Sequence, residues 1–169
     1  MSPRNAPGYI GLSHPAWCDT IVRSRPHRCA FWRGSDRTFK VLEPGAPFFL
    51  LRNAGPKRPI EERAVIGSAQ YLYFDVRPFY DLPNYYGLHE LGVSGADELR
   101  LRLQEIAGRI EARIGVIVLG PLERFRFPVG WTQLPELGIR FARQVVQGMG
   151  LNDAQVEGLL DAGLYGRAR

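Results

Sequence analysis

The stretch from Arg28 to Arg52 holds the residues whose types and spacing best suit chemistry on a ligand. Two adjacent aromatics, Phe31 and Trp32, lead into a polar and basic turn, R-G-S-D-R at 33–37. An aromatic ring can stack on a nucleobase, hydroxyl and carboxylate groups can hydrogen-bond its polar edge, and arginines bind phosphates. The stretch therefore predicts the mouth of a pocket that accepts a nucleobase. Core packing of the two rings is the alternative interpretation, because large aromatics dominate protein interiors.

No signature of a common active site stands out in the sequence. The three histidines, His14, His27 and His89, form no HExxH or HxH pattern, and neither a G-x-S-x-G turn nor a Gly-rich phosphate loop occurs. The two cysteines, Cys18 and Cys29, form no CxxC pair. We expect them to be small buried hydrophobes rather than zinc ligands, although their spacing leaves a disulfide open. We therefore expect a binding module without catalytic residues, metal or cofactor, and not an enzyme.

Basic side chains are concentrated in the first third of the chain. The whole chain has 22 Lys and Arg against 17 Asp and Glu, but residues 1–60 carry ten basic and three acidic side chains, and the remainder is slightly acidic. Twenty of the 22 basic residues are arginines, whose planar forks match phosphates and base edges. This distribution favours a polyanionic partner such as nucleic acid. A solvated Arg-rich surface is the competing interpretation.

The length and composition suit one compact domain, since 45% of the 169 residues are hydrophobic. We expect a flexible N-terminus over residues 1–8, which are rich in Pro, Gly and Asn, and a single domain over residues 9–169. No apolar run is long enough to span a membrane, and the first residues lack the apolar segment of a signal peptide. We therefore expect a cytoplasmic protein with no membrane partner.

Short strands dominate the expected secondary structure. Ser13 is expected to cap a helix over 15–24, Ser94 a helix that runs to about 110, and Asn152 a last helix, and a short helix is expected over 85–91. Gly67 and Ser68 inside a long strand predict a bulge or a close backbone approach. The expected strands are 9–12, 28–33, 47–52, 64–74, 115–120 and 124–127. This order favours a mixed α+β fold, a small barrel flanked by helices, over an alternating βαβ fold.

Several short motifs resemble a PUA-like, EVE-related module found at the N-terminus of modification-dependent restriction endonucleases of the HNH type. The resemblance covers nearly the whole chain and includes Trp17 and Trp131. The motifs, in chain order, are Y-I-G-L-S at 9–13, F-W-R-G-S at 31–35, F-F-L-L-R at 48–52, V-I-G-S-A at 65–69, Y-G-L-H-E-L-G at 86–92, I-G-V-I-V-L-G-P at 114–121 and V-V-Q-G at 145–148.

The resemblance implies a PUA-like small β-barrel with flanking helices, related to EVE and SRA modules. Such a module binds double-stranded DNA carrying a modified base, such as 5-methyl- or 5-hydroxymethylcytosine, by flipping that base into an aromatic pocket. In the full enzymes a C-terminal HNH nuclease then cuts the DNA. We expect this chain to supply the recognition domain only, with the fused HNH nuclease outside it, and we consider a homodimer as its assembly.

Each candidate residue then has a role in base binding or phosphate binding. Trp32 is expected to stack on the flipped base, and Asp36 to accept a hydrogen bond from the exocyclic amine of cytosine. The full base pocket is predicted to comprise Trp17, Phe31, Trp32, Ser35, Asp36, Tyr73 and Trp131. The phosphate ligands are predicted to be Arg33, Arg37, Lys40 and Arg52.

The sequence departs from the family pattern at two places. Residues 66–69 read I-G-S-A where the family has a Gly-rich run, and Tyr85-Tyr86 replace an Ala-Trp pair. These changes leave the size of the pocket and the modification that it accepts open. A PUA-like module that binds RNA or modified RNA is an alternative. A small enzyme acting on a nucleotide-like ligand is another, with Asp36 or His14 as its general base.

Overall fold

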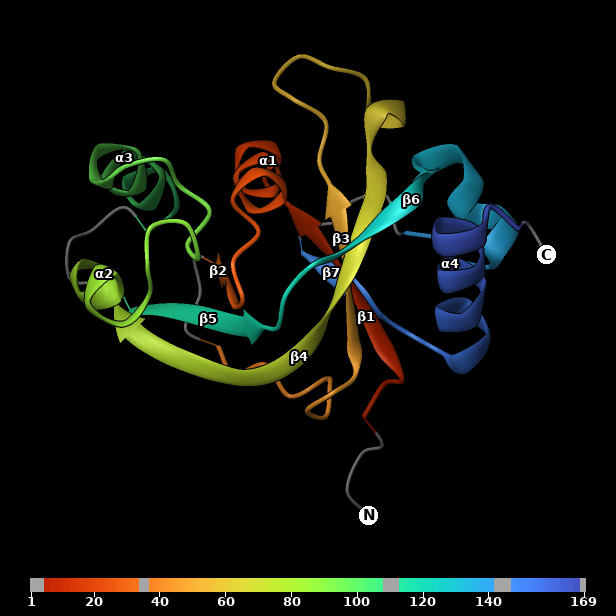
Figure 1. The fold of residues 1–169 in the computed structure, drawn as a ribbon, viewed down its shortest axis with the longest axis horizontal. Helices are drawn as coiled ribbons and strands as arrows, with labels where there is room; N and C mark the ends of the chain where they lie inside the picture. The colour runs from red at the N-terminus through yellow and green to blue at the C-terminus, as the bar shows by residue number, and fades with distance from the viewer. Residues whose placement is uncertain (1–4, 34–36, 108–112, 142–146, 168–169) are drawn as a thin grey trace.

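The computed structural model describes residues 5–33, 37–107, 113–141 and 147–167, and within these ranges seven strands form one sheet (Figure 1). The strands are β1 (Gly8–Ser13), β2 (Cys29–Arg33), β3 (Pro47–Arg52), β4 (Ala64–Pro78), β5 (Arg113–Leu119), β6 (Glu123–Gly130) and β7 (Gly148–Leu151). The α-helices are α1 (Pro15–Ser24), α2 (Leu82–Tyr85), α3 (Ala96–Ala107) and α4 (Asp153–Tyr165). Short 3-10 helices cover Ile60–Glu62 (η1), Phe79–Asp81 (η2) and Trp131–Leu137 (η3).

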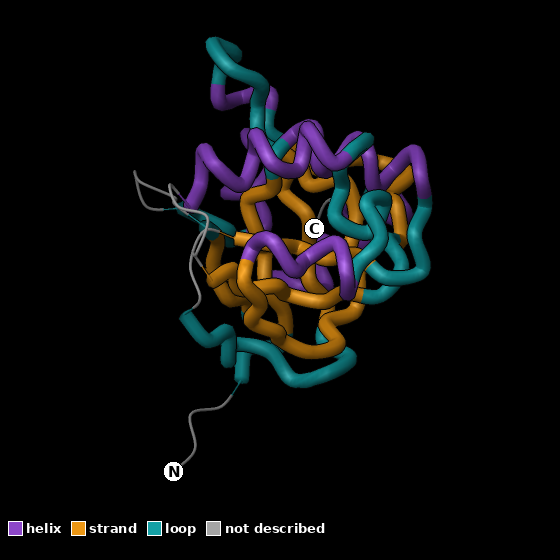
Figure 2. The backbone as a smooth tube through the Cα atoms, turned by 90° about the vertical axis from the view of Figure 1, so that its left-hand side faces the viewer, coloured by secondary structure: helices purple, strands orange, loops and turns teal. Residues whose placement is uncertain are grey.

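The sheet has the order β2-β5-β4-β3-β1-β7, and β6 pairs with β4 beside this path. Strands β1 and β3 are parallel, and the other pairs are antiparallel. The predicted mixed α+β class is confirmed. The pairings of the described residues give an open sheet, because none of them joins β2 to β7 and so closes the expected barrel. In Figure 2 the strands form the centre of the molecule, with helices outside them.

Strand β4 organises the sheet because it pairs with three other strands along its 15 residues. Figure 1 shows it curving across the molecule from β6 to β5. Its register against β6 shifts between Val65 and Gly67, and a Cβ on Gly67 would lie 2.5 Å from the carbonyl oxygen of Glu123. The close backbone approach predicted at Gly67 is therefore confirmed, and it fixes the bend of the strand.

Hydrophobic side chains fill both faces of this sheet. The consecutive residues Phe48 and Phe49 are fully buried, one in each of two hydrophobic clusters, because neighbouring side chains of a strand point to opposite faces. Burial on both faces explains why β3 reads as a continuous apolar run. The first cluster includes α1 and β2, whereas the second includes α4 and η3. The two cysteines are free and buried, as expected.

The bounds of α1 and the cap of α4 follow the predictions, whereas the cap of α1 and the short helix over 85–91 do not. Helix α1 spans the predicted residues, but His14 caps it in place of Ser13, since the Nδ1 atom of His14 accepts a hydrogen bond from the backbone N–H of Ala16 at 3.1 Å. Ser13 is still extended and pairs with Arg52 in the sheet. Asn152 caps α4, as predicted. The short helix expected over 85–91 is wrong, because α2 ends at Tyr85 and tight turns follow it.

Gly92 and Gly138 provide a matched test of how tightly the first cluster is packed. Both have a left-handed φ, +69° and +76°, so alanine at either position should cost about 1–2 kcal/mol of backbone strain. A Cβ on Gly92 would lie 2.1 Å from the indole of Trp17, whereas a Cβ on Gly138 has no atom within 4 Å. We expect Gly92→Ala to lower the free energy of unfolding by about 2 kcal/mol more than Gly138→Ala, measured by urea denaturation. Equal losses would show that the Trp17 side chain is not held in place.

Candidate functional site

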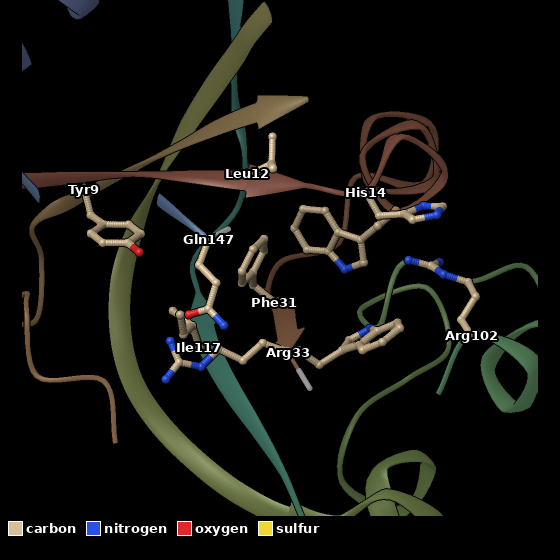
Figure 3. A pocket seen from close by; sticks show the side chains of 10 residues that line it. Tyr9, Leu12, His14, Phe31, Arg33, Arg102, Ile117 and Gln147 are labelled. Carbon is tan, nitrogen blue, oxygen red and sulfur yellow. The ribbon is translucent and has the colours of Figure 1, made fainter. Parts of the chain in front are cut away.

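A pocket of about 270 Å³ opens beside β2, between the end of β1 and helix α3 (Figure 3). Its size is near the lower end of the range for small-molecule sites, which suits a single aromatic ring with its substituents. Aromatic and cationic side chains predominate in its wall. The lining residues are Tyr9, Leu12, His14, Trp17, Phe31, Trp32, Arg33, Arg102, Ile117 and Gln147.

The two indoles of the pocket are held by hydrogen bonds to backbone carbonyls. The Nε1–H of Trp32 donates to the carbonyl of Leu91 at 2.8 Å, and the Nε1–H of Trp17 donates to the carbonyl of Ala30 at 3.2 Å. Their side chains are 8% and 3% exposed. Burying an indole N–H without a partner would be costly, so these two bonds fix the orientation of both rings. The indoles thus form a rigid wall with only small parts of their surface open to the pocket.

Residues 87–93, called here the 87–93 segment, lie beside β2 and accept hydrogen bonds from it, including the one from the indole of Trp32. Its Glu90 carboxylate accepts from Arg28 at 2.8 Å and from the backbone N–H of Gly87 at 2.7 Å. The backbone carbonyl of Glu90 also accepts from the N–H of Ala30 at 2.9 Å. These bonds tie the segment to β2, which is why the carbonyl of Leu91 is available to the indole.

Phe31 presents the most accessible aromatic ring of the wall. It is half-buried, and its ring meets Trp17 edge-on at a centroid distance of 5.4 Å. Figure 3 shows its ring in the middle of the pocket, with Arg33 and Gln147 on one side and His14 and Arg102 on the other. A flat ligand ring can therefore stack near Phe31 and direct its polar edges toward both groups.

The two arginines of the pocket differ in how their charges are balanced. Arg102 is 9% exposed and donates a hydrogen bond to the carbonyl of Gly92 at 3.0 Å. Its guanidinium carbon lies 4.9 Å from the ring centroid of Trp32, and it forms an ion pair with the Glu98 carboxylate at 3.6 Å. Arg33 donates from Nη2 to the backbone carbonyl of Arg37, but its buried Nε has no hydrogen-bond partner among the described residues. Burial lowers the pKa of Arg33, although an arginine stays charged at neutral pH.

His14 joins the pocket through its cap on α1. Burial, and then the positive charge of Arg102, lower the pKa of His14 below its usual value, so the ring is neutral at neutral pH. Because Nδ1 accepts the cap hydrogen bond, the proton of the neutral ring is on Nε2. His14 therefore presents a hydrogen-bond donor, and this protonation state does not suit the general base considered from the sequence.

Of the predicted base-pocket residues, the structure brings Trp17, Phe31 and Trp32 together but leaves Tyr73 and Trp131 elsewhere. Tyr73 lies on β4 with 45% of its surface exposed and does not line the pocket. Trp131 begins η3 and stacks on Phe141 at 5.2 Å beside the second cluster. The aromatic count of the sequence does not reveal which cluster a ring joins. Ser35 and Asp36 lie outside the described residues.

Among the predicted phosphate ligands, Arg33 lies in the pocket wall and the other three lie outside it. Arg37 and Lys40 are exposed. Arg52 binds Asp19 through two nitrogens, at 2.9 and 3.0 Å, so an internal carboxylate already balances its charge. The basic residues near the turn therefore differ in position: Arg33 lines the pocket, whereas Arg37 and Lys40 lie on the surface.

The sequence reasoning did not assign Arg102, Tyr9 or Gln147 to the site. A signal for Arg102 exists in its spacing. It lies three residues after the buried Leu99 on α3, next to the apolar face of that helix, where a charged residue needs a specific partner. No such signal marks Tyr9 or Gln147, which reach the pocket only through the pairing of β1 and the placement of the chain before β7.

A second hollow, of about 390 Å³, adjoins the pocket at His14. It is formed by the loop between β3 and β4, which projects from the body of the molecule in Figures 1 and 2. Arg58 and Arg63 line it, paired with Glu62 and with the side-chain oxygen of Asn53 respectively.

Within the described residues, no group of three His, Cys, Asp or Glu side chains could hold a metal ion. No helix in the same ranges is long and apolar enough to cross a membrane.

No protein-family model and no curated protein sequence matches the chain. Solved structures do match over nearly all of it. An ASCH protein from Zymomonas mobilis aligns with a TM-score of 0.64 at 16% identity, over 91% of this chain and 94% of that chain. Protein PSPTO5229 from Pseudomonas syringae aligns with a TM-score of 0.54 at 14% identity, over 93% and 99%. Human THYN1, solved in complex with DNA containing 5-methylcytosine, aligns with a TM-score of 0.53 at 11% identity, over 92% and 96%.

At these identities the similarities establish the fold alone. They confirm the expected PUA-like fold for the chain. The residues of the pocket, and not the fold, determine what it binds, since one fold supports many functions.

The Arg28–Glu90 pair predicts how the 87–93 segment responds to acid. Burial acts to raise the pKa of Glu90, but hydrogen bonds from Arg28 and from the backbone of Gly87 outweigh it and hold the pKa below its usual value. The stabilisation is therefore complete above the unfolded pKa of about 4.3 and is lost as the pH falls through the folded pKa. We expect the stability difference between the wild type and Glu90→Gln to shrink between about pH 6 and about pH 3, measured by urea unfolding.

Asp97→Asn is the matched control for this prediction. Asp97 pairs with Arg100 on the exposed face of α3, where an ion pair contributes little. Its substitution should change stability slightly at every pH. A Glu90→Gln difference that is constant with pH would contradict the role given to the Arg28–Glu90 pair.

Proposed function

We propose that the chain is a DNA-binding module that recognises a modified cytosine by holding the extruded base in the pocket beside β2. The observation that carries this proposal is the wall itself, where Trp17, Phe31 and Trp32 surround a space of the size of one base. An enclosed aromatic wall with a few polar groups is how proteins bind flipped bases. The fold similarity to THYN1, solved in complex with 5-methylcytosine DNA, supports the same conclusion.

The arrangement of the rings suggests how the base is held. Because Trp32 is mostly covered and its N–H is committed, it would form the back of the pocket and support the stack, with Phe31 as the exposed contact surface. A methyl group on ring position 5 of cytosine would add apolar contact with such a wall. An unmodified base would gain less, and extruding it from the duplex would cost the same energy.

Surface cations would hold the DNA backbone around the pocket. Arg37 and Lys40 are exposed and close in sequence to the pocket strand β2, and the loop between β3 and β4 adds Lys57. Such contacts supply affinity that depends on salt but not on the modification. Arg52 would contribute less than expected from the sequence, because Asp19 already binds it.

We further propose that the module is the specificity domain of a modification-dependent restriction system, with an HNH nuclease as a separate domain, and that it acts without turnover of its own.

A homodimer would bring two pockets to one duplex. Light scattering of the purified chain with and without DNA tests the assembly. Incubation with nucleotides and with modified DNA, followed by chromatography, tests for turnover, and any product would favour the enzyme alternative.

Phe31→Leu and Tyr73→Leu form a matched pair that tests the pocket. We expect Phe31→Leu to weaken binding to a duplex with one 5-methylcytosine by about tenfold to a hundredfold, because a stacked base contributes roughly 1–3 kcal/mol. Tyr73→Leu should leave the preference for the modified duplex unchanged, since Tyr73 lies outside the pocket. Fluorescence anisotropy on otherwise identical duplexes measures both. Equal binding of modified and plain duplexes by the wild type would reject the proposal, and tighter binding of RNA in a parallel titration would favour the RNA alternative.

Arg37→Ala tests the role of the surface cations. We expect it to weaken modified and unmodified duplexes by the same factor and to reduce the slope of log affinity against log salt by about 1. Titrations at several salt concentrations measure this. A selective loss of the modified duplex would instead place Arg37 in base recognition.

A further inference from the structure

We propose that the pocket prefers a base whose modification is anionic, namely a cytosine with a carboxylate on ring position 5, and that Arg33 is the residue that selects it. This inference rests on the proposed function, because it requires that a base enters the pocket. It goes beyond it by assigning the chemical class of the modification and a specificity-determining residue. It also moves Arg33 from the phosphate contacts expected from the sequence to the base itself.

Arg33 is half-buried and has one donor atom that makes no hydrogen bond to the described residues. Its Nε atom is buried and has no hydrogen-bond partner among the described residues. Its guanidinium carbon lies 5.9 Å from the centroid of Phe39 and 5.8 Å from that of Phe74. A buried donor without a partner destabilises the free protein, so an anion that draws the guanidinium toward it and accepts this hydrogen bond relieves that cost.

The charge of Arg33 also lacks a described carboxylate partner. No ion pair of the described residues includes Arg33, whereas the other arginine of the pocket, Arg102, has Glu98 at 3.6 Å and the carbonyl of Gly92 at 3.0 Å. Arg33 instead has the positive charge of Arg37 nearby. A half-buried cation with a second cation beside it favours an anion as the ligand.

The rest of the pocket wall offers hydrogen-bond donors, and its described side chains carry no negative charge. None of the described lining residues is Asp or Glu. His14 presents its Nε2–H, and the hydroxyl of Tyr9 and the amide of Gln147 can also donate. A pocket of this composition matches a ligand edge that carries acceptors, and in particular one that carries negative charge.

The positions of the donors indicate where the negative group lies. Figure 3 shows the Arg33 guanidinium on the same side of the Phe31 ring as Gln147 and Ile117, with His14 and Arg102 on the other side. A base stacked near Phe31 would direct one edge to Arg33 and Gln147. A carboxylate on that edge could bind the arginine fork through two oxygens, the geometry that arginine binds best.

A 5-carboxylate also supplies an acceptor for the 4-amino group of cytosine. The 4-amino group of cytosine is a donor, and the described side chains of the pocket offer it the neutral oxygens of Tyr9 and Gln147 but no carboxylate. A carboxylate on the neighbouring ring position accepts a hydrogen bond from that amino group within the base itself. The outer face of the base then carries acceptors and a negative charge, which complement Arg33.

The test compares duplexes that are identical except for one base: cytosine, 5-methyl-, 5-formyl- or 5-carboxylcytosine. The formyl and carboxyl groups are nearly the same size, but only the carboxyl group is charged at neutral pH. We expect the wild type to bind the carboxyl duplex about tenfold more tightly than the formyl duplex, since charge-assisted hydrogen bonds are about twice as strong as neutral ones. Arg33→Gln should abolish this ratio while it keeps the preference for 5-methylcytosine over cytosine, and Arg33→Lys should keep part of the ratio.

Lys40→Gln is the matched control, since it removes an exposed cation whose charge is not among those that act on Arg33, and it should preserve the ratio. Circular dichroism and thermal unfolding establish that each variant is folded. If the wild type binds the carboxyl and formyl duplexes equally, the inference is wrong whatever the variants do. If Arg33→Gln weakens all four duplexes by one factor, Arg33 binds a backbone phosphate and the inference is again wrong. If no modified duplex binds more tightly than the plain one, the proposed function itself fails.

Discussion

The two hydrogen bonds that fix the indoles of Trp17 and Trp32 are the interaction on which the site depends. Each indole N–H is buried and therefore needs an acceptor, and each acceptor is a backbone carbonyl placed by other contacts. Glu90 helps to hold the carbonyl of Leu91 in position, since its carboxylate accepts from Arg28 and its backbone carbonyl accepts from the N–H of Ala30. The wall of the pocket is thus rigid before any ligand arrives, which limits the entropy lost on binding.

Within the part of the chain that the structure describes, the Nε of Arg33 is the buried side-chain atom that has no hydrogen-bond partner. The indoles, Arg102 and Arg52 all have partners within the protein, and these contribute to stability. Arg33 is different, since it reaches into the wall with a buried nitrogen left over. Such a group lowers the stability of the free protein. In the function proposed for the pocket, a ligand that supplies the acceptor recovers this cost.

The fold is shared with other proteins, whereas the residues of the pocket are particular to this chain. An ASCH protein and human THYN1 have the same arrangement of elements at 16% and 11% identity. Many sequences can fill the two hydrophobic clusters of this sheet, because a core requires suitable volume and polarity more than particular residues. In the function proposed for this chain, ligand choice depends on a few groups such as Arg33 and Gln147, whose identity can change while the fold is retained.

The sequence by itself determined the local structure and much of the core. The apolar run of β3, the spacing of α1 and the cap of α4 follow from local rules, and Phe31 and Trp32 marked the pocket strand. Only the tertiary structure decided which side chains meet there. It separated Tyr73 and Trp131 from the other aromatics, paired Arg52 with Asp19, and brought Arg102 and Gln147 to β2 from distant segments. The physical reason is that burial and hydrogen-bond partners come from strands far apart in the chain, and a local pattern does not record which of them will be neighbours.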